Sequence, residues 1–186
     1  MTDCRDLEMM LLSQANIRTA LDRWTNGKFV KIWPQCEKVS RYMAVYRVCN
    51  AWKNLNSEVK DFTTTSYWDY NTHTLLPSWQ SNLSNEFISK CPDKINISNH
   101  IKEWLDETKL RFNLNEQDSY CFCRGHDVLS VLSNMLVNTN EYSQKNIMQK
   151  LISSYTIADF EKTNLCNSIV KWSDTIGLDF LISNKA

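Results

Sequence analysis

The sequence predicts an all-α protein, a compact bundle of about six or seven helices. Three observations favour this class. Apolar residues recur every three to four positions in most segments, and alternation with period two is nowhere sustained. The 186 residues include only three glycines and three prolines, whereas tight hairpin turns need glycine at fixed positions. The 42% of hydrophobic residues suffice for one ordinary core, so we expect a single domain over residues 1–186.

The first two predicted helices carry the strongest periodicity. One runs from Asp3 to Trp24, with Asn26-Gly27 as its stop signal. Pro34, a residue favoured in a first helical turn, opens the second, which extends to about Leu55. This second helix is apolar on two sides, a pattern typical of a helix between neighbours, and we expect it to be central. Its stripes are Cys36, Val39, Met43 and Tyr46 on one side and Val45, Val48 and Trp52 on the other.

The remaining chain divides into shorter segments. Residues 61–76 lack clear periodicity and predict a long surface connection. Pro77 opens a helix that ends at Cys91-Pro92, because the residue before a proline disfavours helical dihedrals. Ser98 is the candidate N-cap of the next helix. Further helices are predicted over 115–137, with a break near Arg124-Gly125, and over 140–155 and 157–182.

Two of these helices resemble each other in sequence. Six residues recur in type and spacing 68 positions later in the chain. Two hypotheses stay open, because a duplicated helical hairpin and two helices with independently similar apolar stripes would both produce it. The pairs join Asn99, Ile101, Trp104, Asp106, Leu110 and Phe112 to Asn167, Ile169, Trp172, Asp174, Leu178 and Phe180.

Charge and cysteine content limit the functional classes to which the protein can belong. The 21 basic and 21 acidic residues exclude a generally basic nucleic-acid coat and an acidic tail as the main role. No signal-peptide pattern opens the chain, and no apolar run approaches the roughly 20 residues that span a bilayer. Seven irregularly spaced cysteines indicate reduced thiols. We expect a soluble intracellular protein, cytoplasmic or nuclear, with a composition that suits an AT-rich source such as a virus.

The densest group of reactive side chains lies in the run 119–127. Cys121, Cys123 and His126 are residue types that bind zinc, but residues two apart on a helix point roughly 200° away from each other. The same run offers Cys123 as a thiolate, His126 as a base and Asp127 as its partner, yet sequence neighbours rarely form a triad. We therefore predict no enzyme, no cofactor and no metal. The weak candidates for metal ligands are Cys121, Cys123 and His126.

A basic region predicts the alternative function, RNA or DNA binding. Residues 18–60 contain nine basic and three acidic residues, interleaved with aromatic residues, as in sites that combine phosphate attraction with base stacking. A solvated basic face is the other interpretation. The compact part of the region consists of Arg23, Lys28, Lys31, Lys38 and Arg41.

The leading hypothesis is a non-catalytic protein-interaction domain, or a small helical subunit of a larger assembly. Helical domains commonly bind a partner segment in a groove or on one face, and Trp and Tyr are enriched at interfaces. We expect exposed partner-binding residues in or beside the least regular segments. These are Trp33, Trp68, Tyr70 and Trp79.

Overall fold

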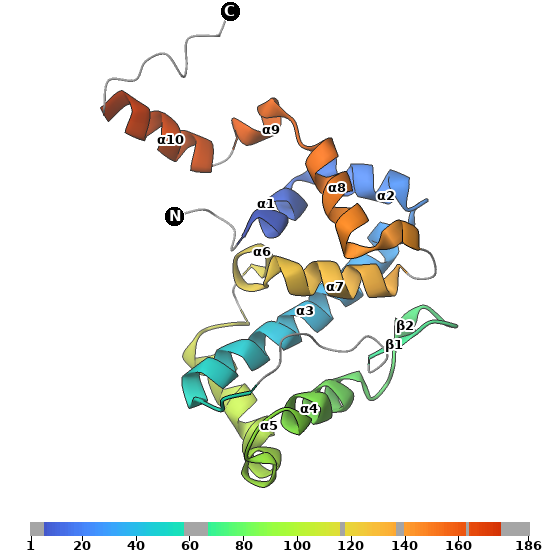
Figure 1. Ribbon diagram of the computed structural model, residues 1–186, viewed down its shortest axis with the longest axis vertical. Helices are drawn as coiled ribbons and strands as arrows, with labels where there is room; N and C mark the ends of the chain where they lie inside the picture. The colour runs from blue at the N-terminus through green and yellow to red at the C-terminus, as the bar shows by residue number, and fades with distance from the viewer. Residues whose placement is uncertain (1–5, 58–66, 116–117, 137–139, 163, 176–186) are drawn as a thin grey trace, which may run out of the picture.

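The computed structural model describes residues 6–57, 67–115, 118–136, 140–162 and 164–175. Within these ranges lie ten α-helices, a 3₁₀ turn at Asn140–Tyr142 and one short β-hairpin (Figure 1), and the all-α class is thereby confirmed. The helices are α1 (Leu7–Ser13), α2 (Ala15–Trp24), α3 (Lys28–Lys53), α4 (Trp79–Ser89), α5 (Lys94–Arg111), α6 (Ser119–Phe122), α7 (Gly125–Met135), α8 (Gln144–Ser154), α9 (Ile157–Phe160) and α10 (Asn164–Thr175), and the strands are β1 (Trp68–Asp69) and β2 (Thr74–Leu75).

Helix breaks explain why ten helices stand where the sequence predicts six or seven. The predicted first helix is interrupted at Gln14, which is extended (φ −78°, ψ 125°). Arg18 stabilises this break, because its Nη1 donates to the carbonyls of Leu12 (2.9 Å) and Ser13 (2.8 Å). The predicted break near residue 124 is found between α6 and α7. The predicted last helix is divided into α9 and α10.

The central helix α3 begins earlier than the sequence predicts. Thr25 Oγ1 accepts the Phe29 N–H at 3.0 Å and Asp22 Oδ1 accepts the Val30 N–H at 3.0 Å, so side chains before the helix cap its first turn. Pro34 therefore lies inside α3, where the ring removes the N–H that would bond to the Val30 carbonyl. Because Val30 is 62% exposed, water can reach that carbonyl.

Two other predicted boundaries are corrected. Asp93, not Ser98, caps α5, and its Oδ1 accepts the Asn96 N–H at 3.2 Å. The part of the predicted surface connection that the structure describes is the antiparallel β-hairpin, in which Trp68 pairs with Leu75. Tyr67, directly before it, is completely buried, so this segment packs on the core. Residues 61–66 lie outside the described residues.

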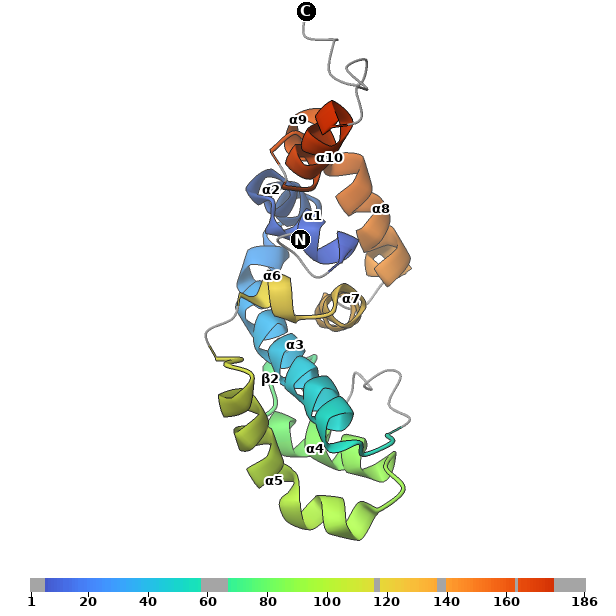
Figure 2. The ribbon, with the colours of Figure 1, turned by 90° about the vertical axis from the view of Figure 1, so that its left-hand side faces the viewer.

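Helix α3 runs through the middle of the structure. The helices α1, α2 and α8 gather near its N-terminal half and α4 and α5 near its C-terminal half (Figures 1 and 2), and α7 and α5 both pack against it. Its first predicted stripe is buried as expected, with each of its four residues at most 3% exposed. In the second stripe Val45 is buried, while Val48 and Trp52 are half-buried.

A buried ion pair joins α3 to α7. Asp127 is 5% exposed and Arg47 22% exposed in their side chains. The guanidinium binds both carboxylate oxygens, with Arg47 Nη2 at 2.6 Å from Asp127 Oδ1. Asp127 also lies in the first turn of α7, where a negative charge is favoured by the helix dipole. The pair thus fixes the register of the two helices.

The burial of matched residues gives limited support to an internal repeat. Ile101 and Ile169 form the one apolar pair whose side chains are both described, and they are 7% and 39% exposed. Ile101 lies in the core between α4 and α5, whereas Ile169 lies on the surface of α10. Leu178 and Phe180 lie outside the described residues. A duplicated hairpin stays a hypothesis.

Replacing Gly125 by alanine is expected to lower the free energy of unfolding by about 1–3 kcal/mol through overpacking. Asp6 caps two helices, since its carboxylate accepts the N–H of Met9 (3.1 Å) and of Gly125 (2.7 Å). A Cβ at Gly125 would lie 2.4 Å from Asp6 Oδ1 and 2.4 Å from Glu8 Cβ. Urea unfolding measures the change, with Ser130→Ala on the same helix as control. Equal midpoints for the two variants would contradict the proposed clash.

Removing the carboxylate of Asp127 should destabilise the fold more than removing a carboxylate from an exposed ion pair. We expect Asp127→Ala to cost about 2–4 kcal/mol, because it leaves the Arg47 charge without its partner in a largely buried place. The control is Glu107→Ala, which breaks the exposed pair between Lys53 Nζ and Glu107 Oε2 (2.7 Å) and should cost about 1 kcal/mol at most. Thermal and urea unfolding report both. Similar losses in the two variants would show that the buried pair contributes little.

Candidate functional site

The four aromatic residues predicted to bind a partner are less accessible than expected. Trp68 is 2% and Trp79 8% exposed, so the expectation of exposure is wrong for both. Trp68 is buried because the hairpin packs on the core, and Trp79 because its ring lies 5.1 Å from that of Tyr42. Trp33 and Tyr70 are half-buried. The structure does not bring the four together as one exposed surface.

The basic candidates divide into engaged and exposed residues. Arg41 is engaged, because its guanidinium donates to Ser119 Oγ (2.9 Å) and to the Leu114 carbonyl (2.8 Å) and lies over the Phe122 ring. Its guanidinium therefore already serves structural contacts, and its role in nucleic-acid binding stays a prediction. The other four are exposed: Arg23, Lys28, Lys31 and Lys38. The three lysines fall within roughly 80° of the α3 circumference, so they share one helix face.

The predicted cysteine–histidine run does not form a site. Cys121 and His126 are exposed, whereas Cys123 is completely buried. Asp127 binds the Arg47 guanidinium through both of its carboxylate oxygens. Among the residues that the structure describes, no group of three or more His, Cys, Asp or Glu side chains could hold a metal ion.

Two tryptophans that the sequence analysis assigned to apolar stripes form an accessible cluster instead. Trp52, near the end of α3, and Trp104, in α5, are both half-buried. Lys53 Nζ lies 3.9 Å from the centre of the Trp52 ring and 5.6 Å from that of Trp104. Both distances are in the range of cation–π attraction. The ammonium group thus connects the two rings.

Further side chains extend this cluster along α5. The Arg111 guanidinium lies 5.0 Å from the Trp52 ring centre, and Phe112 meets the Trp52 ring edge-on at 5.9 Å. His100 stacks on Trp104 with ring centres 5.4 Å apart and an angle of 17° between planes. We call these six residues the Trp52–Trp104 surface. It consists of Trp52, Lys53, His100, Trp104, Arg111 and Phe112.

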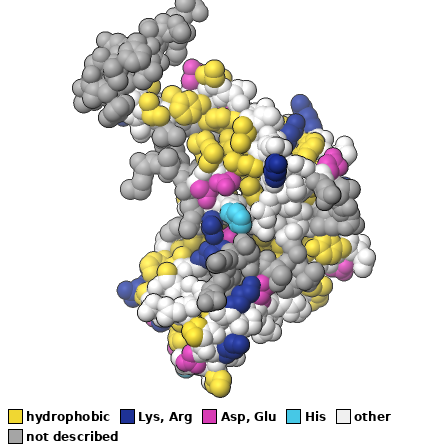
Figure 3. Space-filling view, viewed as in Figure 1, with side chains coloured by type: hydrophobic (Ala, Val, Ile, Leu, Met, Phe, Trp, Pro, Cys, Tyr) yellow, Lys and Arg dark blue, Asp and Glu magenta, His cyan; other side chains and the backbone are white. Residues whose placement is uncertain are grey.

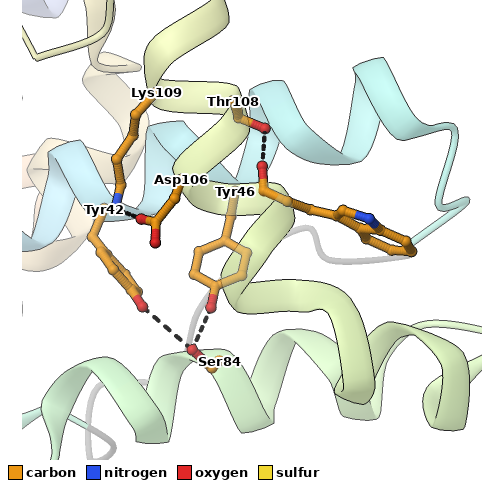
Figure 4. Close-up of polar contacts among 7 residues, drawn as sticks. Tyr42, Tyr46, Ser84, Asp106, Thr108 and Lys109 are labelled. Carbon is orange, nitrogen blue, oxygen red and sulfur yellow. Dashed lines mark hydrogen bonds and ion pairs between the residues drawn. The ribbon is translucent and has the colours of Figure 1, made fainter.

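Helix α5 has one buried stripe and an accessible flank on each side of it. Ile97, Ile101, Leu105 and Thr108 form its buried stripe. Positions three and four residues apart share a helix face, so Trp104 and Arg111 fall together on the flank toward the end of α3. The opposite flank, with Asp106 and Lys109, faces α4 (Figure 4). Adjacent aromatic and basic residues, as in Trp52-Lys53 and Arg111-Phe112, are the sequence signal that could have indicated this cluster.

A groove of about 460 Å³ lies between α4 and α5, with Tyr42 of α3 contributing to its lining. Tyr42 and Tyr46 point toward Ser84 (Figure 4), and Ser84 Oγ also lies 2.9 Å from the Gln80 carbonyl, to which it donates. Burial raises the pKa of Tyr46 above its usual range, so its hydroxyl stays protonated and donates. These bonds make the hydroxyl groups of Tyr42, Tyr46 and Ser84 structural contacts between α3 and α4.

Exposed apolar side chains gather in a different place. They cover α1, α8 and α9 (Figure 3), where Leu7 is 51%, Ile152 54% and Ile157 79% exposed. Leu7, Ile152 and Ile157 are aliphatic, whereas the Trp52–Trp104 surface consists of aromatic and basic side chains. It therefore provides a useful comparison for the Trp52–Trp104 surface.

Comparison with known proteins yields no matching family model, no matching curated protein and no matching solved structure. In the described part of the chain, none of the helices has both the length and the apolar character needed to cross a membrane. Function is therefore argued from the surfaces themselves.

Labelling with iodoacetamide should distinguish the thiols by burial. Cys121 is exposed, whereas Cys36, Cys49 and Cys91 are buried, and burial raises the pKa of these three thiols. Only the thiolate reacts, so between pH 7 and 9 we expect Cys121 to label at least about tenfold faster than Cys36. Peptide mass spectrometry after timed quenching measures this. Denaturant should equalise the rates, and rapid labelling of native Cys36 would contradict the burial.

Proposed function

We propose that this chain is a non-catalytic, intracellular protein-interaction domain that binds a protein partner through the Trp52–Trp104 surface. The observation that supports it is the meeting of two half-exposed tryptophans from separate helices with Lys53 and Arg111 against their rings. Trp and Arg are the residue types most enriched among interface residues that dominate binding energy. Their mutual contacts hold the side chains in place before a partner arrives, which reduces the entropic cost of binding.

The charges around this surface favour a protein over a nucleic acid. Glu103 is exposed on α5, with a side-chain exposure of 79%, and lies one helical turn from His100. Glu107 is paired with Lys53. Such carboxylates repel phosphates. Base stacking also needs an open ring face, whereas Trp52 is already in contact with both Lys53 and Arg111.

Nucleic-acid binding remains a second proposal, at the other end of α3. It is supported by the exposed lysines that share one face of this helix, Lys28, Lys31 and Lys38. With Arg41 engaged in structural contacts, few cations are left for phosphates. A gel-shift titration should then show weak binding that falls steeply with salt. Binding that does not depend on salt would remove this proposal.

The intracellular location is supported by the cysteines. None of the six described cysteines is in a disulfide, and four of them are buried. Thiols persist in reducing compartments. The location is tested by fractionation of the native source with an antibody against the chain.

A binding comparison tests the main proposal. The tagged full chain, treated with nuclease, is used to capture a partner from an extract of its native source, and the dissociation constant of the purified partner is then measured by calorimetry. Trp104→Ala with Arg111→Ala should weaken binding at least about 30-fold, the loss expected for residues that dominate an interface. Thermal unfolding confirms that the variant is folded.

The matched control changes the apolar face over α8 and α9. Ile152→Ser with Ile157→Ser removes two exposed apolar side chains and should leave the dissociation constant within about twofold. If the control loses binding and the tryptophan variant retains it, the assignment of the surface is wrong. If nuclease abolishes capture, or no protein is captured, the protein-interaction proposal fails.

A further inference from the structure

A second cavity lies at the opposite end of α3 from Trp52. Its volume is about 350 Å³, and it is lined by residues at the start of α3, in the turn of the β-hairpin and at the end of α7. This volume falls at the lower end of the range of small-molecule sites, roughly 300–1,000 Å³. The cavity is separate from the Trp52–Trp104 surface, so its ligand is a separate question.

The inner wall of the cavity is apolar. Ile32 of α3 and Met135 and Leu136 of α7 line it, and they are 6%, 2% and 3% exposed. These side chains offer no hydrogen bond to a ligand. They therefore favour an apolar group of modest size.

The rim of the cavity carries donors. Lys28 and Lys31 are one helical turn apart, and both are exposed. Gln35 Oε1 accepts the Leu75 N–H at 3.0 Å, so the side-chain amide of Gln35 presents its NH₂ group as a donor. His73 of the hairpin turn adds an imidazole. None of these lining residues is acidic, and the rim is therefore suited to an anionic acceptor.

The side chains of the two lysines are not engaged in polar contacts with other described residues, in contrast to four other basic residues of this region. Arg18, Arg41, Arg47 and Lys53 each bind an oxygen of another residue. The ammonium groups of Lys28 and Lys31 make no hydrogen bond or ion pair with a described residue. Asp22 lies at this helix start, where its Oδ1 accepts the Val30 N–H. Lys28 and Lys31 lie in the first turn of α3, where cations are unfavourable, and the Asp22 carboxylate offsets part of this cost. An anion bound at the rim would offset more of it.

We infer that this cavity binds a small amphipathic anion, whose oxygen-bearing head group contacts Lys28, Lys31 and Gln35 and whose apolar body lies against Ile32, Met135 and Leu136. The head group is a carboxylate or a phosphate, because both accept hydrogen bonds from ammonium and amide groups. Binding involves no covalent step. It does not depend on the partner proposed for the other end of α3.

Titration of the full chain with octanoate, acetate, octanol and inorganic phosphate tests the inference. Octanoate has both a negative charge and an apolar body. It should bind at least about tenfold more tightly than acetate or phosphate, which lack the apolar body, and at least about tenfold more tightly than octanol, which lacks the charge. Backbone amide NMR should place its shifts at His73 and Leu136. Equal binding of octanol would show that the lysines take no part. Equal binding of phosphate would show that the apolar wall takes none, and either result overturns the inference.

A pair of charge variants completes the test. Lys28→Gln with Lys31→Gln should weaken octanoate binding at least about tenfold. Lys94→Gln with Lys102→Gln removes the same charge from exposed positions on α5 and should leave it within about twofold. No octanoate binding by the wild type, or equal binding by both variants, overturns the inference. So does displacement of octanoate by a tighter-binding single-stranded oligonucleotide, which would assign the lysines to a nucleic-acid site.

Discussion

The fold depends on the burial of α3 on two sides. At 26 residues the helix is about 39 Å long, and it packs against both α7 and α5. Cys36, Val39 and Tyr46 have no measurable exposure. Cys36 Sγ lies 3.7 Å from the Val128 carbonyl of α7, and the Tyr46 ring lies 4.6 Å from the Phe87 ring of α4, so loss of either neighbour would uncover buried side chains of α3. Burial of one such side chain contributes about 1.5–3 kcal/mol. The helices at both ends of the structure are therefore stabilised by the same central element.

Arginine side chains connect α2 and α3 to the elements around them. Arg18 reaches Tyr120, Arg41 reaches Leu114 and Ser119, and Arg47 reaches Asp127. The guanidinium has several donors in a rigid plane and can satisfy two acceptors at once, so it serves in contacts where the ammonium of lysine would satisfy fewer. Part of the basic excess of residues 18–60 is thus structural. A charge count could not reveal this, because it treats arginine and lysine alike.

Helical periodicity predicted the class, most helix positions and the central place of α3, because these depend on local spacing. The breaks and the exposure of individual rings depend on distant residues. Gln14 is neither glycine nor proline, and its break is completed by Arg18. In the sequence the stripe through Val45 and Trp52 continues to the end of α3, whereas in the structure Val45 is buried and Trp52 is half-buried. Trp68 and Trp79 are covered by contacts that no local pattern encodes.

The two proposed sites occupy places where the sequence departs from what stability alone favours. Lysines at the positive end of α3 and half-exposed tryptophans at its other end both lower the stability of the protein without its ligands. Residues that lower stability in this way concentrate at functional positions. Lys28 and Trp52 are 24 residues apart on one helix, a separation of about 36 Å. The two sites share no residue. The binding free energies at the two ends should therefore add independently, as they do for distant sites without shared contacts.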